Sequence, residues 1–147
     1  MSFHTEDPSL ELSSRRTGMS FQRTRLSADR TLMSVIRTSL ALISFGFTIF
    51  QFFSRLEEQG VTKRPHSPRN FGGVLVYIGV AMICVGILFH VQFMRALRRE
   101  RTEMVADGLI RGESPFPISY TLVIALLLLV FGFAAIASMT FGVGLSG

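Results

Sequence analysis

The sequence predicts an all-α integral membrane protein with three transmembrane helices. Three long windows carry no charged residue, at 38–54, 70–94 and 114–147. The charged residues lie between these windows, and 48% of the 147 residues are hydrophobic. A bilayer core is crossed by about 20 apolar helical residues, so each window is long enough to supply most or all of one span. The length suits one domain.

The N-terminal part divides into a tail and a first span. Residues 1–25 are rich in Ser, Thr and Arg and have no hydrophobic period, which predicts a disordered basic cytoplasmic tail. Its arginines suit contact with anionic lipid head groups, or a solvated flank. The membrane domain is expected over 26–142. Its first span is predicted at about 31–53, with Ser27 as the N-cap and Asp29 in the first turn.

The second and third spans are predicted at about 72–94 and 118–141. Good helix formers follow the second span, so we expect its helix to continue out of the membrane into the cytoplasm to about Asp107. Glycines and prolines then separate it from the third span, which contains no charge. Residues 143–147 are expected to form a short external tail.

The distribution of basic residues predicts the topology. Ten basic residues flank the membrane on the side of the N-terminus and second loop, and four lie in the first loop. Because basic residues collect on the cytoplasmic side, we expect the N-terminus inside and the C-terminus outside. The expected location is the cell (inner) membrane, as a multi-pass protein.

A polar stripe runs along the first span. Its members are spaced alternately four and three residues apart, a period that keeps them on one side of a helix. Two arginines of the stripe closely follow the predicted helix start, where the helix dipole disfavours a cation and Asp29 is the local counter-charge. The polar stripe comprises Arg30, Ser34, Arg37, Ala41, Ser44, Thr48, Gln51 and Arg55.

The arginines are the candidate functional residues. A guanidinium binds phosphate or carboxylate with two parallel hydrogen bonds. Arg95, Arg98 and Arg99 leave the second span on the same side as Arg30, so together they predict a basic vestibule. Structural roles are open as well, because Arg30 can reach lipid phosphates. For Arg37, the structural alternative is pairing with a carboxylate of a neighbouring helix.

The second span also carries residues that suit helix packing. Gly72, Gly79 and Gly86 recur every seven residues and would let another helix approach closely. His90 is interpreted as an interfacial hydrogen bonder rather than a proton relay. Cys84 is interpreted as a small apolar packing residue.

The sequence shows no pattern typical of catalysis. It has no nucleophile paired with a base, no glycine-rich phosphate loop and no cluster with metal-ligand spacing. We therefore expect a protein that is not an enzyme, with no cofactor, metal or nucleic-acid partner.

The run from Leu26 to Ala41 resembles a family motif, Leu-Ala-x-Glu-Arg-Thr-x-Leu-Ala-x-x-Arg-Thr-x-Leu-Ala. The motif is that of the YidH-like small inner-membrane proteins, a domain of unknown function. The chain also looks like the membrane subunit of the fungal vacuolar transporter chaperone complex, which makes and translocates polyphosphate. The likeness covers about residues 23–142. Asp29 replaces the usual Glu, and Val35 stands where Trp is common.

The resemblance implies a three-helix domain that forms a homo-oligomer. In the chaperone complex, basic residues of the first two helices line the polyphosphate path, and the motif carries this role over to Arg30. Arg95, Arg98 and Arg99 fall in the corresponding basic stretch, whereas Arg37 matches only the bacterial motif.

Two functions are compatible with the sequence. One is an oligomeric pore or translocation subunit for phosphate-containing anions, with the polar stripe along the path and arginines at the cytoplasmic entrance. The other is a non-conducting scaffold or assembly subunit, whose arginines anchor to lipid phosphates and partner carboxylates.

Overall fold

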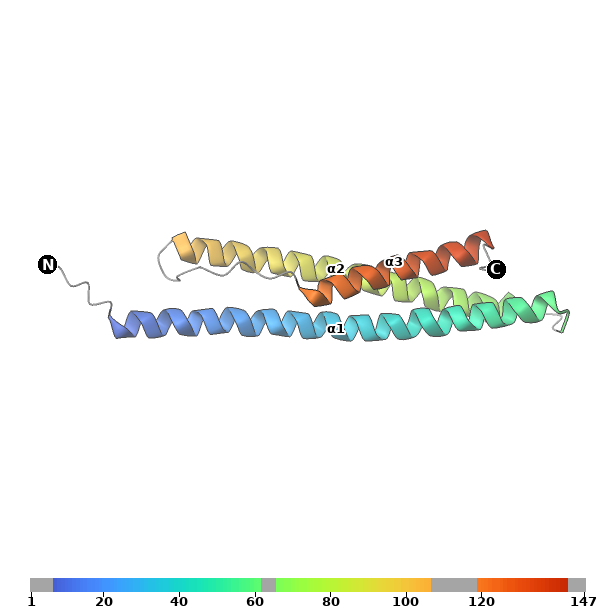
Figure 1. Ribbon diagram of the computed structural model, residues 1–147, viewed down its shortest axis with the longest axis horizontal. Coiled ribbons are helices and arrows are strands. Elements are labelled where there is room, and N and C mark those ends of the chain that lie inside the picture. The colour runs from blue at the N-terminus through green and yellow to red at the C-terminus, as the bar shows by residue number, and fades with distance from the viewer. Residues whose placement is uncertain (1–6, 62–65, 107–118, 143–147) are drawn as a thin grey trace.

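The computed structural model describes residues 7–61, 66–106 and 119–142. Its elements are three helices, α1 (Pro8–Glu58), α2 (His66–Ala106) and α3 (Tyr120–Phe141). The helices lie side by side along one long axis, and α2 runs opposite to α1 and α3 (Figure 1). The described residues contain no strand, so the predicted all-α class is confirmed.

All three helices are long and apolar enough to cross a membrane. The 22 residues of α3 span about 33 Å, close to the thickness of a bilayer core. The 51 residues of α1 span about 76 Å and the 41 residues of α2 about 62 Å, so both exceed that thickness. Figure 1 shows them continuing past the start of α3 as a two-helix extension (residues 8–28 and 91–106).

The N-terminal part of α1 differs from the expected disordered tail over residues 1–25. The helix begins at Pro8, whose fixed φ suits the first helical turn. One turn later, Arg15 Nη2 lies 2.6 Å from Glu11 Oε1, a pair with the i,i+4 spacing that supports helices. Ser27 consequently lies deep inside α1 rather than at its N-cap.

Packing against α2 gives this polar segment a further reason to be helical. Thr17, Phe21 and Thr24 of α1 line a shallow cavity of about 360 Å³ together with Phe93 and Leu97 of α2. The two segments of the extension therefore contact each other beyond the point where α3 begins. Such tertiary contacts stabilise helices whose own sequence pattern is weak.

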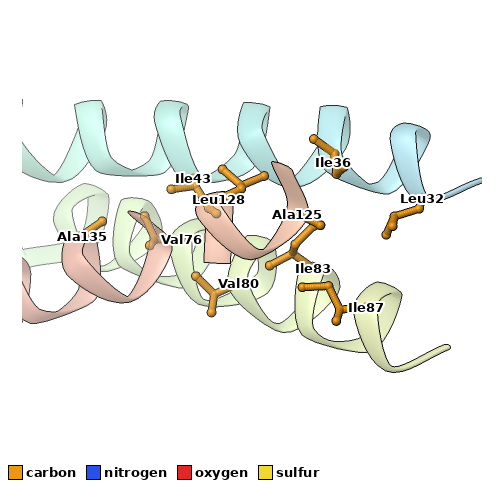
Figure 2. Close-up of a cluster of buried hydrophobic side chains, with 10 residues drawn as sticks. All are labelled: Leu32, Ile36, Ile43, Val76, Val80, Ile83, Ile87, Ala125, Leu128 and Ala135. Atoms are coloured by element: carbon orange, nitrogen blue, oxygen red, sulfur yellow. The ribbon is translucent and has the colours of Figure 1, made fainter. Parts of the chain in front are cut away.

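The core lies where all three helices run together (Figure 2). Ile43, Val76 and Ile83 are completely buried in it. The core side chains are Leu32, Ile36, Ile43, Val76, Val80, Ile83, Ile87, Ala125, Leu128 and Ala135. Cys84 packs against this cluster as a half-buried side chain.

Glycines allow the close approach of α1 and α2. A Cβ atom built on Gly72 would lie 2.7 Å from the carbonyl oxygen of Gly46, closer than packed atoms tolerate. A Cβ on Gly79 would meet Ile43 at 2.8 Å, and one on Gly86 would meet Val35 at 2.7 Å. The glycine seam of the second span therefore faces α1 of the same chain.

The turn after α1 is fixed by backbone and side-chain contacts. Gly60 adopts a φ of 68°, a left-handed conformation that glycine reaches without steric cost. Arg69 Nη1 lies 2.7 Å from Glu57 Oε2, and its guanidinium stacks 5.7 Å from the ring centroid of Phe50. These contacts join the end of α1 to the start of α2.

The observed helix ends can be compared with the expected spans. The helix of the second span ends at Ala106, close to the expected Asp107, and α3 covers nearly all of the expected 118–141. The expected break between them, at residues 107–118, and the tail at 143–147 lie outside the described residues. The orientation of the termini relative to the cytoplasm stays a prediction.

Candidate functional site

The polar stripe lies on the outer surface of α1. Its members Arg30, Ser34, Arg37, Ser44 and Thr48 are all exposed. The opposite side of the same helix is packed inside the molecule and carries the buried residues Leu32, Ile36, Ser39, Ile43 and Gly46. These exposed members of the stripe therefore take no part in holding the three helices of one chain together.

The two arginines at the start of the stripe have no carboxylate partner among the described residues. The ion pairs of the described residues join Arg15 to Glu11 and Arg69 to Glu57, and Asp29 lies beside His90. Asp29 lies level with the beginning of α3, because Ser119 donates a hydrogen bond to it. Arg37 is eight residues further along α1, about 12 Å deeper beside the apolar α3. A charge at that depth is costly when it faces lipid.

The position of α1 changes one part of the sequence interpretation. Arg30 and Arg37 were expected near a helix start, opposed by the helix dipole. The helix begins at Pro8, about six turns before Arg30, and the dipole acts only over the first and last turns. The predicted conflict between the helix dipole and these two arginines is therefore wrong, and their exposure in the spanning segment is what makes them unusual.

Two threonine hydroxyls on or beside the stripe are satisfied within α1. The Thr48 hydroxyl donates to the Ser44 carbonyl oxygen at 2.8 Å, and the Thr38 hydroxyl donates to that of Ser34 at 3.1 Å. Hydroxyls bonded in this way do not require a partner outside the helix. Among the stripe residues, the hydroxyl of Thr48 is therefore satisfied, and the strongest demand for a polar environment comes from Arg30 and Arg37.

The arginines that follow the second span do not lie on the side of α2 that packs against α1. Gly86 and His90 mark the side of α2 that lies toward α1. Arg99 follows His90 by about two and a half turns, which places it on the opposite side of α2. Arg95, Arg98 and Arg99 are exposed. A basic vestibule that joins Arg30 to Arg99 therefore needs more than one copy of the chain.

A second polar cluster lies where all three helices meet. Ser119 is the N-cap residue of α3, but its side chain makes no hydrogen bond to the start of that helix. Its hydroxyl instead donates a hydrogen bond to Asp29 Oδ1 of α1 at 3.0 Å. His90 Nε2 of α2 lies 3.7 Å from the same oxygen. We call Asp29, His90 and Ser119 the three-helix junction. It is the one described place where polar side chains of α1, α2 and α3 come together.

His90 is the unusual member of the junction. The residue is only 4% exposed, and neither ring nitrogen has a hydrogen-bond partner in the described part of the chain. Buried polar atoms are nearly always paired, so this arrangement calls for an explanation. Sequence reasoning singled out Asp29 and His90 separately but did not connect them, and it did not identify Ser119.

The family comparison agrees with the motif in α1. A family model described as a domain of unknown function (DUF202) matches residues 23–102. This match covers more than half of the chain. The protein belongs to the DUF202 family. The matched segment holds the polar stripe, the glycine seam and the basic exit of α2.

Membership in DUF202 supports the YidH-like resemblance, because YidH-like proteins belong to this family. The family has no assigned function, so the match assigns no role to any residue. No curated protein and no solved structure is similar enough to match the chain. In the described residues there is no group of three or more His, Cys, Asp or Glu that could hold a metal ion. This DUF202 protein is a small multi-pass membrane protein by the length and composition of its helices.

Proposed function

We propose that this DUF202 protein is a homo-oligomeric pore or translocation subunit for phosphate-containing anions. In the proposed assembly, copies of α1 turn the polar stripe toward a shared aqueous path in the cell (inner) membrane. Arg30 and Arg37 form successive rings of positive charge along that path. Rings of arginine select anions, and guanidinium groups favour phosphate oxygens.

The observation that carries the proposal is the exposure of Arg37. The side chain lies in the spanning part of α1, on the face opposite the packed residues, without an ion-pair partner in the described chain. A permanently charged side chain within a bilayer ordinarily faces water, a cavity or another protein segment. A second copy with a water-filled interface meets this requirement, whereas a single chain in lipid does not.

The charge of the α1–α2 extension supports an anionic cargo. Its two segments contain eight arginines and only three acidic residues. Such an excess of positive charge raises the local concentration of anions near the entrance. On the proposed topology, with the N-terminus inside, the extension lies in the cytoplasm and anions would enter from there. Phosphate or polyphosphate is the proposed cargo.

A non-conducting scaffold remains the second proposal. The observation in its favour is that Thr48 of the stripe bonds to its own helix, so this part of the stripe tolerates an apolar neighbour. In this version the arginines of the extension bind anionic lipid head groups. Arg37 pairs with a carboxylate of a partner protein.

Copy number is the first measurement that separates these proposals. Native mass spectrometry of the protein released from mild detergent should give a closed ring of several copies if it forms a pore. A monomer or a simple dimer cannot enclose an axial path. That result would exclude the pore and leave the scaffold.

Thiol labelling then shows what the stripe faces. After Cys84→Ala removes the native thiol, cysteines are introduced singly at Ser34, Ser44 and Thr48. A membrane-impermeant thiol reagent should label all three if they line an aqueous path. Val130→Cys is the matched control, because Val130 is 67% exposed on the apolar α3 and should stay protected in lipid. Equal protection of all four positions would contradict the pore.

Anion flux tests the arginines themselves. In reconstituted vesicles, Arg30→Ala combined with Arg37→Ala should abolish most uptake of phosphate or short polyphosphate. Arg16→Ala is the comparison, because Arg16 is exposed on α1 outside the spanning part and is only one of the eight arginines of the extension, so its loss should lower uptake far less. Uptake by the double variant equal to that of the Arg16 control would contradict the proposed role of the rings.

A further inference from the structure

We propose that a groove between α1 and α2 binds one anionic phospholipid from the leaflet on the side of the α1–α2 extension. The groove has a volume of about 740 Å³. Sites for small molecules typically measure about 300–1,000 Å³. The groove is lined by residues of α1 and α2 and by no described residue of α3. The inference concerns the surface of one chain and does not depend on whether the polar stripe lines an anion path.

The groove opens on the side of α2 that faces away from α3. Val80 marks the side toward α3, because a Cβ atom built on Gly132 would lie 2.6 Å from it. Ile78 and Met82 line the groove and each lie two positions from Val80, which is about 200° around a helix. Val85 also lines the groove and is 64% exposed. In a bilayer this surface therefore meets lipid unless another protein segment covers it.

The length of the groove matches one leaflet. The length of α3 is close to the thickness of a bilayer core, so Asp29 and His90, which lie level with its start, mark the surface of that core. Ile78 is the deepest lining residue of α2 and lies twelve positions from His90, or about 18 Å along the axis. Half of a bilayer core measures about 15 Å. An acyl chain that enters at the level of His90 can therefore follow the groove to its inner end.

The lining changes from polar to apolar in the same direction as a phospholipid. Thr24 and Ser27 line the outer end, about 8 Å and 3 Å outside the level of Asp29. The head-group region on one side of a bilayer is about 5–7 Å thick, so these hydroxyls lie in it or at its border. Val35 and Ile78 line the inner end. An amphiphile with its polar end outward fits this order.

His90 adds an unpaired polar group to the outer part of the groove. The residue lines the groove, is 4% exposed, and has no hydrogen-bond partner for either ring nitrogen in the described part of the chain. Buried polar groups are nearly always paired. A polar group of a lipid at this level would give the imidazole a partner that the described chain does not supply.

The charge beside the outer end favours an anionic lipid. Arg23 precedes Ser27 by four positions, so it lies one turn further out on the same side of α1. Arg23 is exposed, and a guanidinium binds phosphate oxygens with two parallel hydrogen bonds. The extension around it contains eight arginines and only three acidic residues, so the positive charge is not neutralised by its surroundings. The proposed lipid places its phosphate near Arg23 and one acyl chain in the groove.

Quenching of a single tryptophan by brominated lipid tests the proposal. The chain has no tryptophan of its own. Val85→Trp places the fluorophore in the groove, and Ile124→Trp places it on α3 as the matched control. Val85 lies five positions inward from His90 and Ile124 five positions inward from Ser119, so the two depths agree. Both side chains are exposed, at 64% and 45%, so each site has room for the larger ring.

Each variant is reconstituted in phosphatidylcholine vesicles that contain a small share of brominated lipid, either phosphatidylglycerol or phosphatidylcholine. One arginine beside an anionic head group should raise the affinity about fivefold. We therefore expect the groove tryptophan to be half quenched by about one fifth as much brominated phosphatidylglycerol as brominated phosphatidylcholine. The tryptophan on α3 should respond to the two lipids alike.

Two arginine variants in the Val85→Trp background show where the preference arises. Arg23→Ala should remove most of it, whereas Arg16→Ala, two turns further out on α1, should keep most of it. Equal quenching of the groove tryptophan by the two lipids would overturn the proposal. Weak quenching by both would overturn it as well, because a second copy or another protein segment would then cover the groove. A preference of the same size at Ile124→Trp, or one unchanged by Arg23→Ala, would also contradict the proposed site.

Discussion

The two sides of α1 carry residues at the same spacing, but one side is buried inside the molecule and the other is exposed. Leu32, Ile36, Ser39, Ile43 and Gly46 repeat every three or four residues and are buried against α2 and α3. Arg30, Ser34, Arg37, Ala41 and Ser44 repeat in the same way on the other side and are exposed. One side therefore builds the fold of a single chain, and the other side is left for an environment outside it.

This contrast separates the residues of one helix that hold the fold together from those that do not. In lipid, close packing of helices replaces much of the role that exclusion of water has in soluble proteins. Small and well-fitted residues are therefore needed on the buried side. The outer side contributes nothing to that packing, so its polar residues are retained at a cost in membrane insertion. Substitutions on the two sides should consequently differ in kind as well as in size.

The largest effect is expected from filling the glycine contact. A Cβ on Gly46 would lie 2.6 Å from the Gly72 carbonyl oxygen and 2.9 Å from the Val76 backbone nitrogen, so the backbones must separate. Gly46→Leu should destabilise the bundle by more than about 3 kcal/mol. Thermal unfolding in detergent, followed by circular dichroism, measures the loss.

The control for this substitution lies on the same helix. Gly18 has no atom within 4 Å of its Cβ position, so Gly18→Leu meets open space. Replacing a helical glycine that has open space around its Cβ position should stabilise α1 by about 0.5–1 kcal/mol. If Gly46→Leu and Gly18→Leu unfold alike, the described approach of α1 and α2 is contradicted.

A somewhat smaller loss is expected from Ile43→Ala. Ile43 is 0% exposed and sits between Gly79 of α2 and Gly132 of α3. The cavity left behind should cost about 2–4 kcal/mol. Phe45→Ala removes more atoms at a position that is 63% exposed, and its effect on unfolding should be below about 1 kcal/mol. Unfolding curves for both variants decide the point, and equal losses would show that α1 is rotated from the described orientation.

On the outer side of α1, replacing a polar residue by an apolar one should be favourable rather than unfavourable. Arg37→Leu replaces a charge by an apolar side chain in the spanning segment, so membrane insertion of α1 should become more favourable by about 2–3 kcal/mol. A glycosylation-based insertion assay of the isolated segment measures this shift. If insertion is unchanged, Arg37 already reaches the interface and is not a buried charge of the membrane domain.

Much of this arrangement follows from residue pattern alone. The absence of charge predicts the three spans, the good helix formers after Met94 predict the extension of α2, and spacing predicts the polar stripe. These features are local. Each depends on residues within a few turns of one another, and the physics of lipid and of the helix acts directly on them.

The remaining features depend on contacts between distant segments. Residues 8–25 lack a hydrophobic period, and their helix is supported by packing against Phe93 and Leu97 of α2. Gly46 is an isolated glycine whose role is apparent only beside Gly72. The three-helix junction joins residues 29 and 119, which are 90 positions apart. No pattern within one helix could bring these residues together.

The smallest effect is expected at Ser39, on the buried side. Its hydroxyl oxygen is fully buried and has no hydrogen-bond partner among the described residues. Ser39→Ala removes this unsatisfied group, so stability should stay the same or rise by less than about 1 kcal/mol. Equilibrium unfolding measures the change. A clear loss of stability would mean that the hydroxyl has a partner within the bundle.

The unbroken length of α1 has a mechanical consequence. The helix has no proline after Pro8 and runs through the membrane segment and the extension as one rod. The end at Pro8 lies about 31 Å from the level of Asp29. A tilt of about 10° around that level would move this end by about 5 Å, if the helix stays straight. Because the helix is continuous, a displacement of its outer end would be carried to the residues around Asp29.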